Sequence, residues 1–313
     1  MTVAERDKKF AMNEKFAQVV QKFVPGSNLL HVWTLQGGIS AQVTALEIEQ
    51  PDGRRKKLIV RQHGEPDLKH NPRVATDEFK LLHLLHSAGL AVPVPYYLDQ
   101  SDEIFSTPYI VLEYIEGTSE VAPKHLPAYI LQLATHLSSI HHVDCSRLDL
   151  SFLPQQERRY ARMLRERPAT IDAAGDEGRI RAALKAAWPF PQQNQAVLLH
   201  GDFWPGNILW QHERLVAIID WEDAALGDPL ADLANSRLEM LWAFGRDAME
   251  HFTRQYQAMT AIDFTNLPYW DLCAALRPMS QFAIWAANES SATTMRERHR
   301  WFINQAFEKL AVQ

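Results

Sequence analysis

The sequence predicts an α+β protein with a small antiparallel-sheet N-lobe and a larger, mainly helical C-lobe. Three observations favour this fold class. Strand-like stretches separated by turn residues occupy residues 30–62, apolar side chains recur at helical spacing from residue 125 onward, and one strand-like island at 196–220 interrupts the helices. We therefore expect residues 1–115 to form the N-lobe and residues 116–313 to form the C-lobe.

The N-lobe is expected to begin with an amphipathic helix that ends near Pro25. Its apolar side chains follow the spacing i, i+3, i+4 and i+7, at Phe16, Val19, Val20 and Phe23. The elements expected after it are three strands, one helix and a further strand, at 30–33, 41–49, 57–61, 75–88 and 109–112.

The composition is that of a globular protein, and it excludes several functional classes. The chain has 313 residues, a formal net charge of -6 and a pI of about 6.1, whereas binding to nucleic acid requires a concentrated basic face. Its apolar runs are too short to span a bilayer, and Met1–Lys9 is too polar for a signal sequence. Cys145 and Cys273 fit neither a disulfide framework nor a CxxC metal site, so a reducing cytoplasm is the expected location.

The island contains the residues that point to chemistry. From residue 197 it reads Val-Leu-Leu-His-Gly-Asp-Phe-Trp-Pro-Gly-Asn-Ile-Leu-Trp, and it ends in Ile-Ile-Asp-Trp-Glu. A short strand leads into a loop that contains Asp202, and two apolar runs around a polar turn predict a β-hairpin. Because a hairpin brings its two ends together, Asn207 at its start and Asp220 at its end should lie side by side, next to Asp202.

This set of side chains suits phosphoryl transfer. Mg²⁺ prefers oxygen ligands such as those of Asn207 and Asp220, which leaves Asp202 to orient an attacking hydroxyl and accept its proton. The spacing of His200, Asp202 and Asn207, with Asp220 after them, matches the catalytic signature of protein kinases. Simple loop or turn roles remain open for each, and for His200 a structural role, hydrogen-bonding the loop backbone, is the preferred interpretation.

The chain resembles the aminoglycoside phosphotransferase and choline kinase-like family. The resemblance is carried by the segments His200–Leu209, Ile219–Glu222 and Gly227–Ala234. It implies a two-lobed, protein-kinase-like fold, ATP or GTP bound between the lobes, Mg²⁺, and a small hydroxylated acceptor held by the helical lobe. Gly201 stands where regulated protein kinases have an arginine, so we expect an enzyme that needs no activating phosphorylation.

The resemblance also implies nucleotide-binding roles in the N-lobe, for Gly37, Gly38, Ser40, Arg61, Glu78, Glu113 and Ile115. The two glycines would let backbone N–H groups approach phosphate, although a plain hairpin turn fits them equally well. Arg61 replaces the family's strand lysine and can still bind phosphate, with Glu78 as its partner; an exposed arginine and a surface glutamate are the alternatives. Main-chain groups of Glu113 and Ile115 would bind adenine.

The acceptor is less well defined. Residues 200–250 contain ten acidic and three basic side chains, a local net charge of -7 that could attract a cationic acceptor or could simply form a solvated face. Aminoglycoside-, sugar-, choline- and amino-acid-like acceptors stay open, as do ATP against GTP and the oligomeric state. Two rival functions remain: a catalytically silent nucleotide-binding protein of the same fold, and a metal-dependent hydrolase.

Residues that flank the motif have structural interpretations. Asp228 before Pro229 predicts a helix N-cap. Asp232 lies in the first turns of that helix, where a carboxylate suits the helix dipole. His141 is expected to be a core or C-cap histidine.

Overall fold

The computed structural model describes residues 3–35, 41–119, 122–166, 176–279 and 289–312. The chain divides into two compact units, Met1–Glu116 and Gly117–Gln313. No helix of the described residues is long and apolar enough to cross a membrane.

Unit 1 is built on an antiparallel sheet of five strands in the order β1-β2-β3-β5-β4. The strands are β1 (Asn28–Thr34), β2 (Ala41–Glu49), β3 (Arg55–His63), β4 (Pro95–Asp99) and β5 (Tyr109–Glu113). Its helices are α1 (Val3–Phe23), α2 (Glu65–His70) and α3 (Val74–Ser87). Four of the strands, β1, β2, β3 and β5, and the two longer helices agree with the sequence analysis, which did not identify β4. The six-residue α2 is new, because so short a helix has no apolar period to reveal it.

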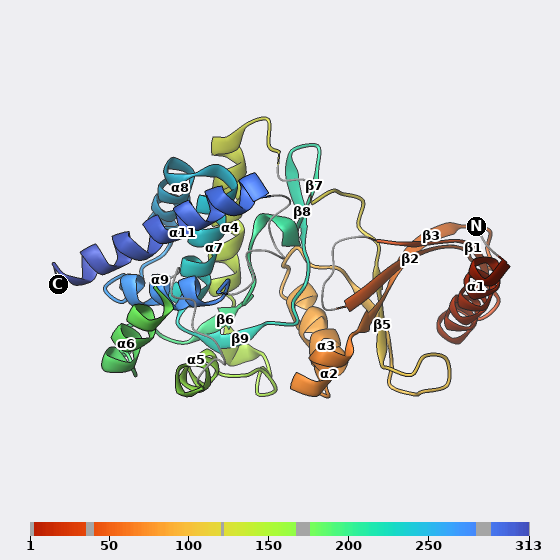
Figure 1. Ribbon diagram of the computed structural model, residues 1–313. Helices are drawn as coiled ribbons and strands as arrows, with labels where there is room; N and C mark the ends of the chain where they lie inside the picture. The colour runs from red at the N-terminus through yellow and green to blue at the C-terminus, as the bar shows by residue number, and fades with distance from the viewer. Residues whose placement is uncertain (1–2, 36–40, 120–121, 167–175, 280–288, 313) are drawn as a thin grey trace. The chain divides into compact units, whose positions relative to one another are not determined.

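Side chains along β3 alternate between the two faces of the sheet, and the two faces differ in polarity. Leu58 and Val60 point into the core beneath α1, where Phe16 and Val19 also pack. Arg61, on the opposite face, reaches Glu78 of α3. Figure 1 shows α1 and α3 on either side of the sheet. The apolar face therefore holds the unit together, and the other face buries a charged pair.

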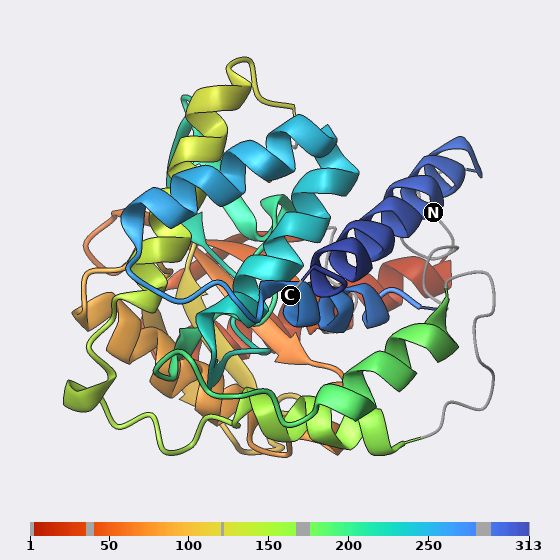
Figure 2. The same ribbon diagram turned by 90° about the vertical axis from the view of Figure 1, so that its left-hand side faces the viewer.

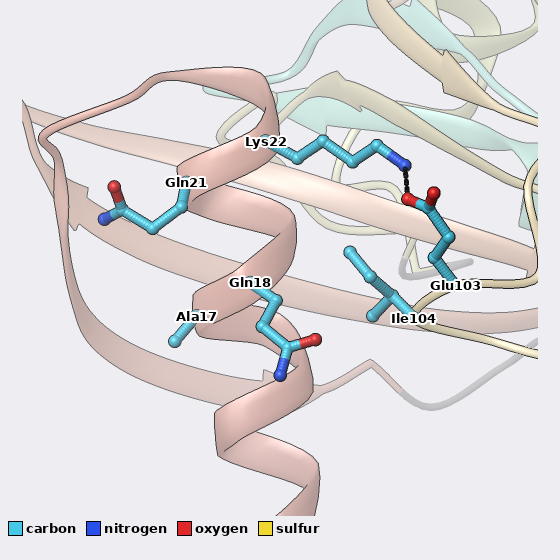
Figure 3. Close-up of a pocket in the computed structure, with 6 residues that line it drawn as sticks. All are labelled: Ala17, Gln18, Gln21, Lys22, Glu103 and Ile104. Atoms are coloured by element: carbon cyan, nitrogen blue, oxygen red, sulfur yellow. Dashed lines mark hydrogen bonds and ion pairs between the residues drawn. The ribbon is translucent and has the colours of Figure 1, made fainter.

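Residues that line a groove beside α1 also attach this helix to the sheet. Figure 3 shows Lys22 pointing across the groove to Glu103, at 2.7 Å. The same ammonium group lies 2.8 Å from buried Asp99. Burial raises the pKa of Asp99, but the hydrogen bonds from Lys22 and Ser101 outweigh this effect and lower it to about 2. The charged wall of the groove is thus part of the contact between helix and sheet.

Unit 2 is mainly helical. Its described α-helices are α4 (Leu126–His141), α5 (Gln156–Arg165), α6 (Glu177–Ala187), α7 (Pro229–Phe244), α8 (Arg246–Met259), α9 (Leu267–Leu276) and α11 (Glu289–Leu310). α7 is the centre of this unit, because it packs against α8, α9, α11 and the first strand of the island. In Figure 2, α8 (light blue) lies against α4 (yellow-green).

A buried ion pair fixes α9 against α7. Nε and Nη2 of Arg237 each lie 3.0 Å from a carboxylate oxygen of Asp271. Thr253 of α8 accepts from the same guanidinium, and Gln305 of α11 donates to Asp271. Four helices therefore meet at one fully paired polar site in the core, which sets their relative positions.

The island forms two small antiparallel ladders. β6 (Val197–Leu199) pairs with β9 (Ala225–Gly227), and β7 (Ile208–Gln211) forms the expected hairpin with β8 (Arg214–Ile218). The sequence analysis did not identify β9, since three residues are too few to show alternation. The expected irregular loop before the hairpin also contains a 3₁₀ turn at Pro205–Asn207, because proline is well tolerated at the first helical position.

Candidate active site

Asp202 and Asn207 lie together in the loop between β6 and β7. Nδ2 of Asn207 donates to Oδ2 of Asp202 at 3.1 Å and to the backbone oxygen of Asp202 at 3.0 Å. The 3₁₀ turn produces this contact, because it reverses the chain within the few residues that separate the two side chains. Asp202 is half-buried and Asn207 is buried. The loop thus holds its carboxylate in a defined orientation.

The hairpin brings its two ends together as expected. The backbone N–H of Ile219 donates to the backbone oxygen of Asn207 at 2.9 Å. Asp220 follows directly and has a φ of 68°, in the left-handed region that few residues other than glycine, asparagine and aspartate adopt. The backbone at Asp220 is therefore next to Asn207, while a shared metal site for the two side chains stays a prediction.

His200 joins the loop to the hairpin. Its Nε2 lies 3.1 Å from the backbone oxygen of Ile219, and its Nδ1 lies 3.2 Å from the backbone nitrogen of Asp202. These partners require Nε2 to carry the proton and Nδ1 to accept, which is the neutral tautomer. Burial lowers the pKa of His200 and favours the same state. His200 therefore has the structural role expected from the sequence.

Asp232 of α7 fixes the start of the loop that contains Asp202. Its carboxylate accepts from the backbone N–H of His200 at 2.7 Å and from that of Gly201 at 2.9 Å. His141 of α4 lies 3.3 Å from the same group. Burial raises the pKa of Asp232, but the hydrogen bond from His141 and the other nearby donors outweigh this effect and lower it. The helix-dipole role expected for Asp232 is therefore only a small part of what it does.

A polar stripe runs along α7 beneath this loop. Its members are Asp232, Ser236 and Glu239, at the spacing i, i+4 and i+7, which places them on one face of the helix. Ser236 donates from Oγ to the backbone oxygen of Phe203 at 2.9 Å. Most other residues of α7 are apolar and buried. Polar residues at helical spacing in an otherwise apolar helix were the sequence signal that could have identified α7 as the helix that holds the loop.

Glu239 has a perturbed carboxyl group near the loop. Burial raises its pKa to about 8, and the charge of Asp202 contributes in the same direction. Glu239 is therefore largely protonated at neutral pH and can donate a hydrogen bond. It adds little to the negative charge of the site.

Replacing Glu239 by glutamine is expected to stabilise the protein at alkaline pH. The folded-state pKa is raised above the unfolded value near 4.5, so the folded state binds more protons between these values and stability falls as pH rises through this window. At pH 8 the variant should gain on the order of 2–4 kcal/mol over wild type, and little at pH 4. Urea unfolding of the apo protein at both pH values measures this. Glu250→Gln, on the exposed surface of α8, is the matched control, and equal gains at both pH values would contradict the assignment.

Two arginines from distant segments neutralise the carboxylates around the loop. Nη2 of Arg277, at the end of α9, lies 3.0 Å from Oδ1 of Asp202 and 4.0 Å from Oδ2 of Asp223. Arg159 of α5 lies 2.5 Å from the other oxygen of Asp223. Burial raises the pKa of Asp223, but the charges of Arg159 and Arg277 outweigh this effect and lower it. Two carboxylates and two guanidinium groups thus form a cluster with no net charge.

Gly201 allows two loops to meet inside this cluster. Its φ is 82°, and a Cβ atom there would lie 2.1 Å from the backbone oxygen of Asp223. Any other side chain would clash with this oxygen and would also strain the backbone. The glycine that stands in place of the protein-kinase arginine therefore has a structural reason.

Unit 1 buries the second group of residues singled out by sequence. Nε of Arg61 lies 3.1 Å from Oε2 of Glu78, and Nε2 of His63 lies 2.9 Å from the same oxygen. Burial raises the pKa of Glu78, but the charge of Arg61 and the hydrogen bond from His63 outweigh this effect and lower it to about 2. The structure thus brings Arg61 and Glu78 together, and it adds His63, which the sequence analysis missed.

The structure gives less information on the remaining candidates for nucleotide binding. Gly37, Gly38 and Ser40 lie outside the described residues. Glu113 ends β5, where its backbone N–H donates to the backbone oxygen of Val94 at 2.9 Å. Ile115 follows in a segment without regular structure. Adenine binding by these residues stays a prediction.

A family model matches most of the chain, and several curated proteins match part of it. Residues 33–276 match the model of the phosphotransferase enzyme family. Acyl-CoA dehydrogenase family member 11 of Rattus norvegicus is 26% identical over 230 residues, 64% of this chain and 29% of that protein. Member 10 from Mus musculus is 26% identical over 199 residues, 58% of this chain and 18% of that protein. LicA of Haemophilus influenzae is 28% identical over 154 residues, 48% of this chain and 54% of that protein.

Solved structures show the same fold. An aminoglycoside 2'-phosphotransferase-IIIa with GDP aligns over 95% of this chain and 96% of its own, with a TM-score of 0.65 and 15% identity. A macrolide 2'-phosphotransferase aligns over 95% and 97%, with a TM-score of 0.64 and 17% identity. The fold is therefore the protein-kinase-like one that the sequence predicts. Because the family model covers most of the chain, this protein belongs to the phosphotransferase enzyme family.

Proposed function

We propose that this protein is a small-molecule kinase that transfers the terminal phosphate of ATP, or of GTP, to a hydroxyl of a small acceptor. The observation that carries the proposal is the fixed carboxylate of Asp202, which Asn207 and Arg277 hold by one oxygen each. Spectinomycin phosphotransferase, which shares the fold with a TM-score of 0.61, has been solved with ADP and spectinomycin. A nucleotide donor and a hydroxylated acceptor are consistent with that likeness.

In the proposed reaction the acceptor oxygen forms a bond with the γ-phosphorus while the bond from that phosphorus to the β–γ bridging oxygen breaks. The bridging oxygen leaves with the electron pair as part of ADP or GDP, and the hydroxyl proton passes to the carboxylate of Asp202. Proton acceptance by a positioned side chain and alignment of the reacting groups are what this chain supplies.

The residues proposed for Mg²⁺ have suitable chemistry. Asn207 uses its Nδ2 in hydrogen bonds to Asp202, so its side-chain oxygen is the atom that it can offer to a cation. Asp220 adds a carboxylate, and both are the hard oxygen ligands that Mg²⁺ prefers. When bound, the ion would neutralise charge on the terminal phosphates.

The two units would have different roles in the proposed reaction. In unit 1, the Arg61 guanidinium, held by Glu78, would bind nucleotide phosphate, and the segment with Gly37 and Gly38 would cover it. In unit 2, the loop with Asp202 would act on the acceptor. Arg277 and Arg159 offset two of the acidic side chains between residues 200 and 250, and Glu239 is largely protonated. The acidic surplus is therefore weaker support for a cationic acceptor than the sequence suggested.

A mass-spectrometric acceptor screen tests the proposal. The protein is incubated with ATP or GTP, Mg²⁺ and separate aminosugar, amino-alcohol, neutral-sugar and hydroxy-amino-acid acceptors. A phosphorylated acceptor in equal amount to the nucleoside diphosphate released supports it. Nucleotide binding without turnover on any acceptor would support the silent nucleotide-binding alternative, and phosphate release to water without a phosphorylated product would support the hydrolase.

A further inference from the structure

We propose that Arg277 is a positioning residue for the transfer reaction, which orients Asp202 from outside the sequence motif; this inference rests on the proposed function. Nη2 of Arg277 donates to Oδ1 of Asp202 at 3.0 Å, and its Nη1 donates to the backbone oxygen of Gly201 at 2.8 Å. One planar guanidinium therefore contacts both the side chain of Asp202 and the peptide group that precedes it.

This contact completes the restraint on the carboxylate. Asn207 donates to Oδ2 of Asp202, and Arg277 donates to Oδ1. A carboxylate with one donor on each oxygen has little freedom to rotate, because rotation would break both hydrogen bonds. With Asn207 alone, the carboxylate of Asp202 could still rotate about that one hydrogen bond. The hydrogen bond from Arg277 to the other oxygen fixes the plane of the carboxylate.

The rest of the unit holds Arg277 in place. It is the C-cap residue of α9, where the negative end of the helix dipole favours a cation. The buried pair of Arg237 and Asp271 pins the same helix to α7. α7 in turn carries Asp232, which binds the loop through two backbone N–H groups. The arginine and the loop therefore rest on connected elements, and the distance between them is set by the core.

Charge supports the same role. The Arg277 side chain is mostly buried, at 28% exposure. Burial lowers its pKa, but the charges of Asp202 and Asp223 outweigh this effect and raise it, so the cation persists. Arg159 pairs with Asp223 without a contact to Asp202 among the described residues. The two arginines of the cluster therefore have different roles: Arg159 orients Asp223, and Arg277 orients Asp202.

The test compares Arg277→Gln and Arg277→Lys with two other arginine variants, using an acceptor from the screen. Arg181→Gln is the matched control, since Arg181 also joins a carboxylate, that of Glu177, to a backbone oxygen, that of Met163. Arg159→Gln removes the other guanidinium group on Asp223. We expect Arg277→Gln to lower kcat by about 10- to 100-fold, with the KM for nucleotide within about threefold of wild type.

Further readouts separate positioning from folding. Arg277→Lys should recover part of kcat, and millimolar guanidinium chloride should raise the kcat of Arg277→Ala but not that of Arg181→Gln. A kcat for Arg277→Gln within threefold of wild type would overturn the proposal. So would equal losses in Arg159→Gln and Arg277→Gln, or an inactive Arg277→Ala that guanidinium does not rescue. Failure of the proposed function is distinct, because wild type would then phosphorylate no acceptor.

Discussion

Replacing Asp202 by asparagine is expected to lower kcat by about 10²–10⁴-fold, the range that proton acceptance by a positioned side chain contributes. Asparagine has nearly the same shape, and its oxygen can still accept from Arg277, while its Nδ2 loses the hydrogen bond from Asn207. The backbone contact from Asn207 to residue 202 remains to hold the loop. What it lacks is the basic oxygen that we propose takes the hydroxyl proton. The KM for nucleotide should change little, because Asp202 is not proposed to bind phosphate. Initial rates with the acceptor from the screen measure both quantities.

Asp220→Asn is the informative companion of this variant. If Asp220 binds Mg²⁺, its replacement should raise the Mg²⁺ concentration needed for half-maximal rate, whereas Asp202→Asn should leave that concentration near the wild-type value. An Asp202→Asn enzyme with transfer within tenfold of wild type would remove Asp202 from the chemistry. Equal Mg²⁺ dependence in both variants would remove the distinction between base and metal ligand.

The parts that the sequence could predict are those encoded by local patterns. The hairpin after Asn207 follows from two apolar runs around a polar turn, and its ends meet in the structure. The N-cap role of Asp228 follows from the proline after it, and its side chain does accept from the backbone N–H of Leu230. The pairing of Arg61 with Glu78, which the structure shows, was implied by the family resemblance. In each case the partners are close in sequence or linked by one regular element.

The parts that it missed depend on packing between distant segments. Arg277 lies 75 residues from Asp202, and Arg159 lies 64 residues from Asp223. Nothing in the residues around an arginine indicates which carboxylate it meets after folding, because that depends on how helices pack. Burial is equally hidden in sequence: Glu239 reads as an ordinary helix glutamate, although the environment raises its pKa to about 8.

Asp232→Ala is expected to cost about 3–5 kcal/mol of unfolding free energy, because it leaves the backbone N–H groups of His200 and Gly201 buried without their carboxylate. The sequence interpretation, a carboxylate near a helix N-terminus, would cost only about 0.3–1 kcal/mol. The two interpretations thus differ several-fold in a single measurement by urea unfolding. Asp232→Asn should lose less than alanine, since its side-chain oxygen can still accept from one of the two N–H groups.

Asp228→Ala is the matched control, because it removes a carboxylate four residues earlier that caps the same helix; its cost should be about 1 kcal/mol. The advantage of wild type over Asp232→Ala should also depend on pH. The folded-state pKa of Asp232 is lowered from 3.8, so its contribution is present above that value and is lost as pH falls below it. If Asp228→Ala and Asp232→Ala lose the same free energy, Asp232 is only a helix-end charge, and the loop that contains Asp202 must be held in some other way.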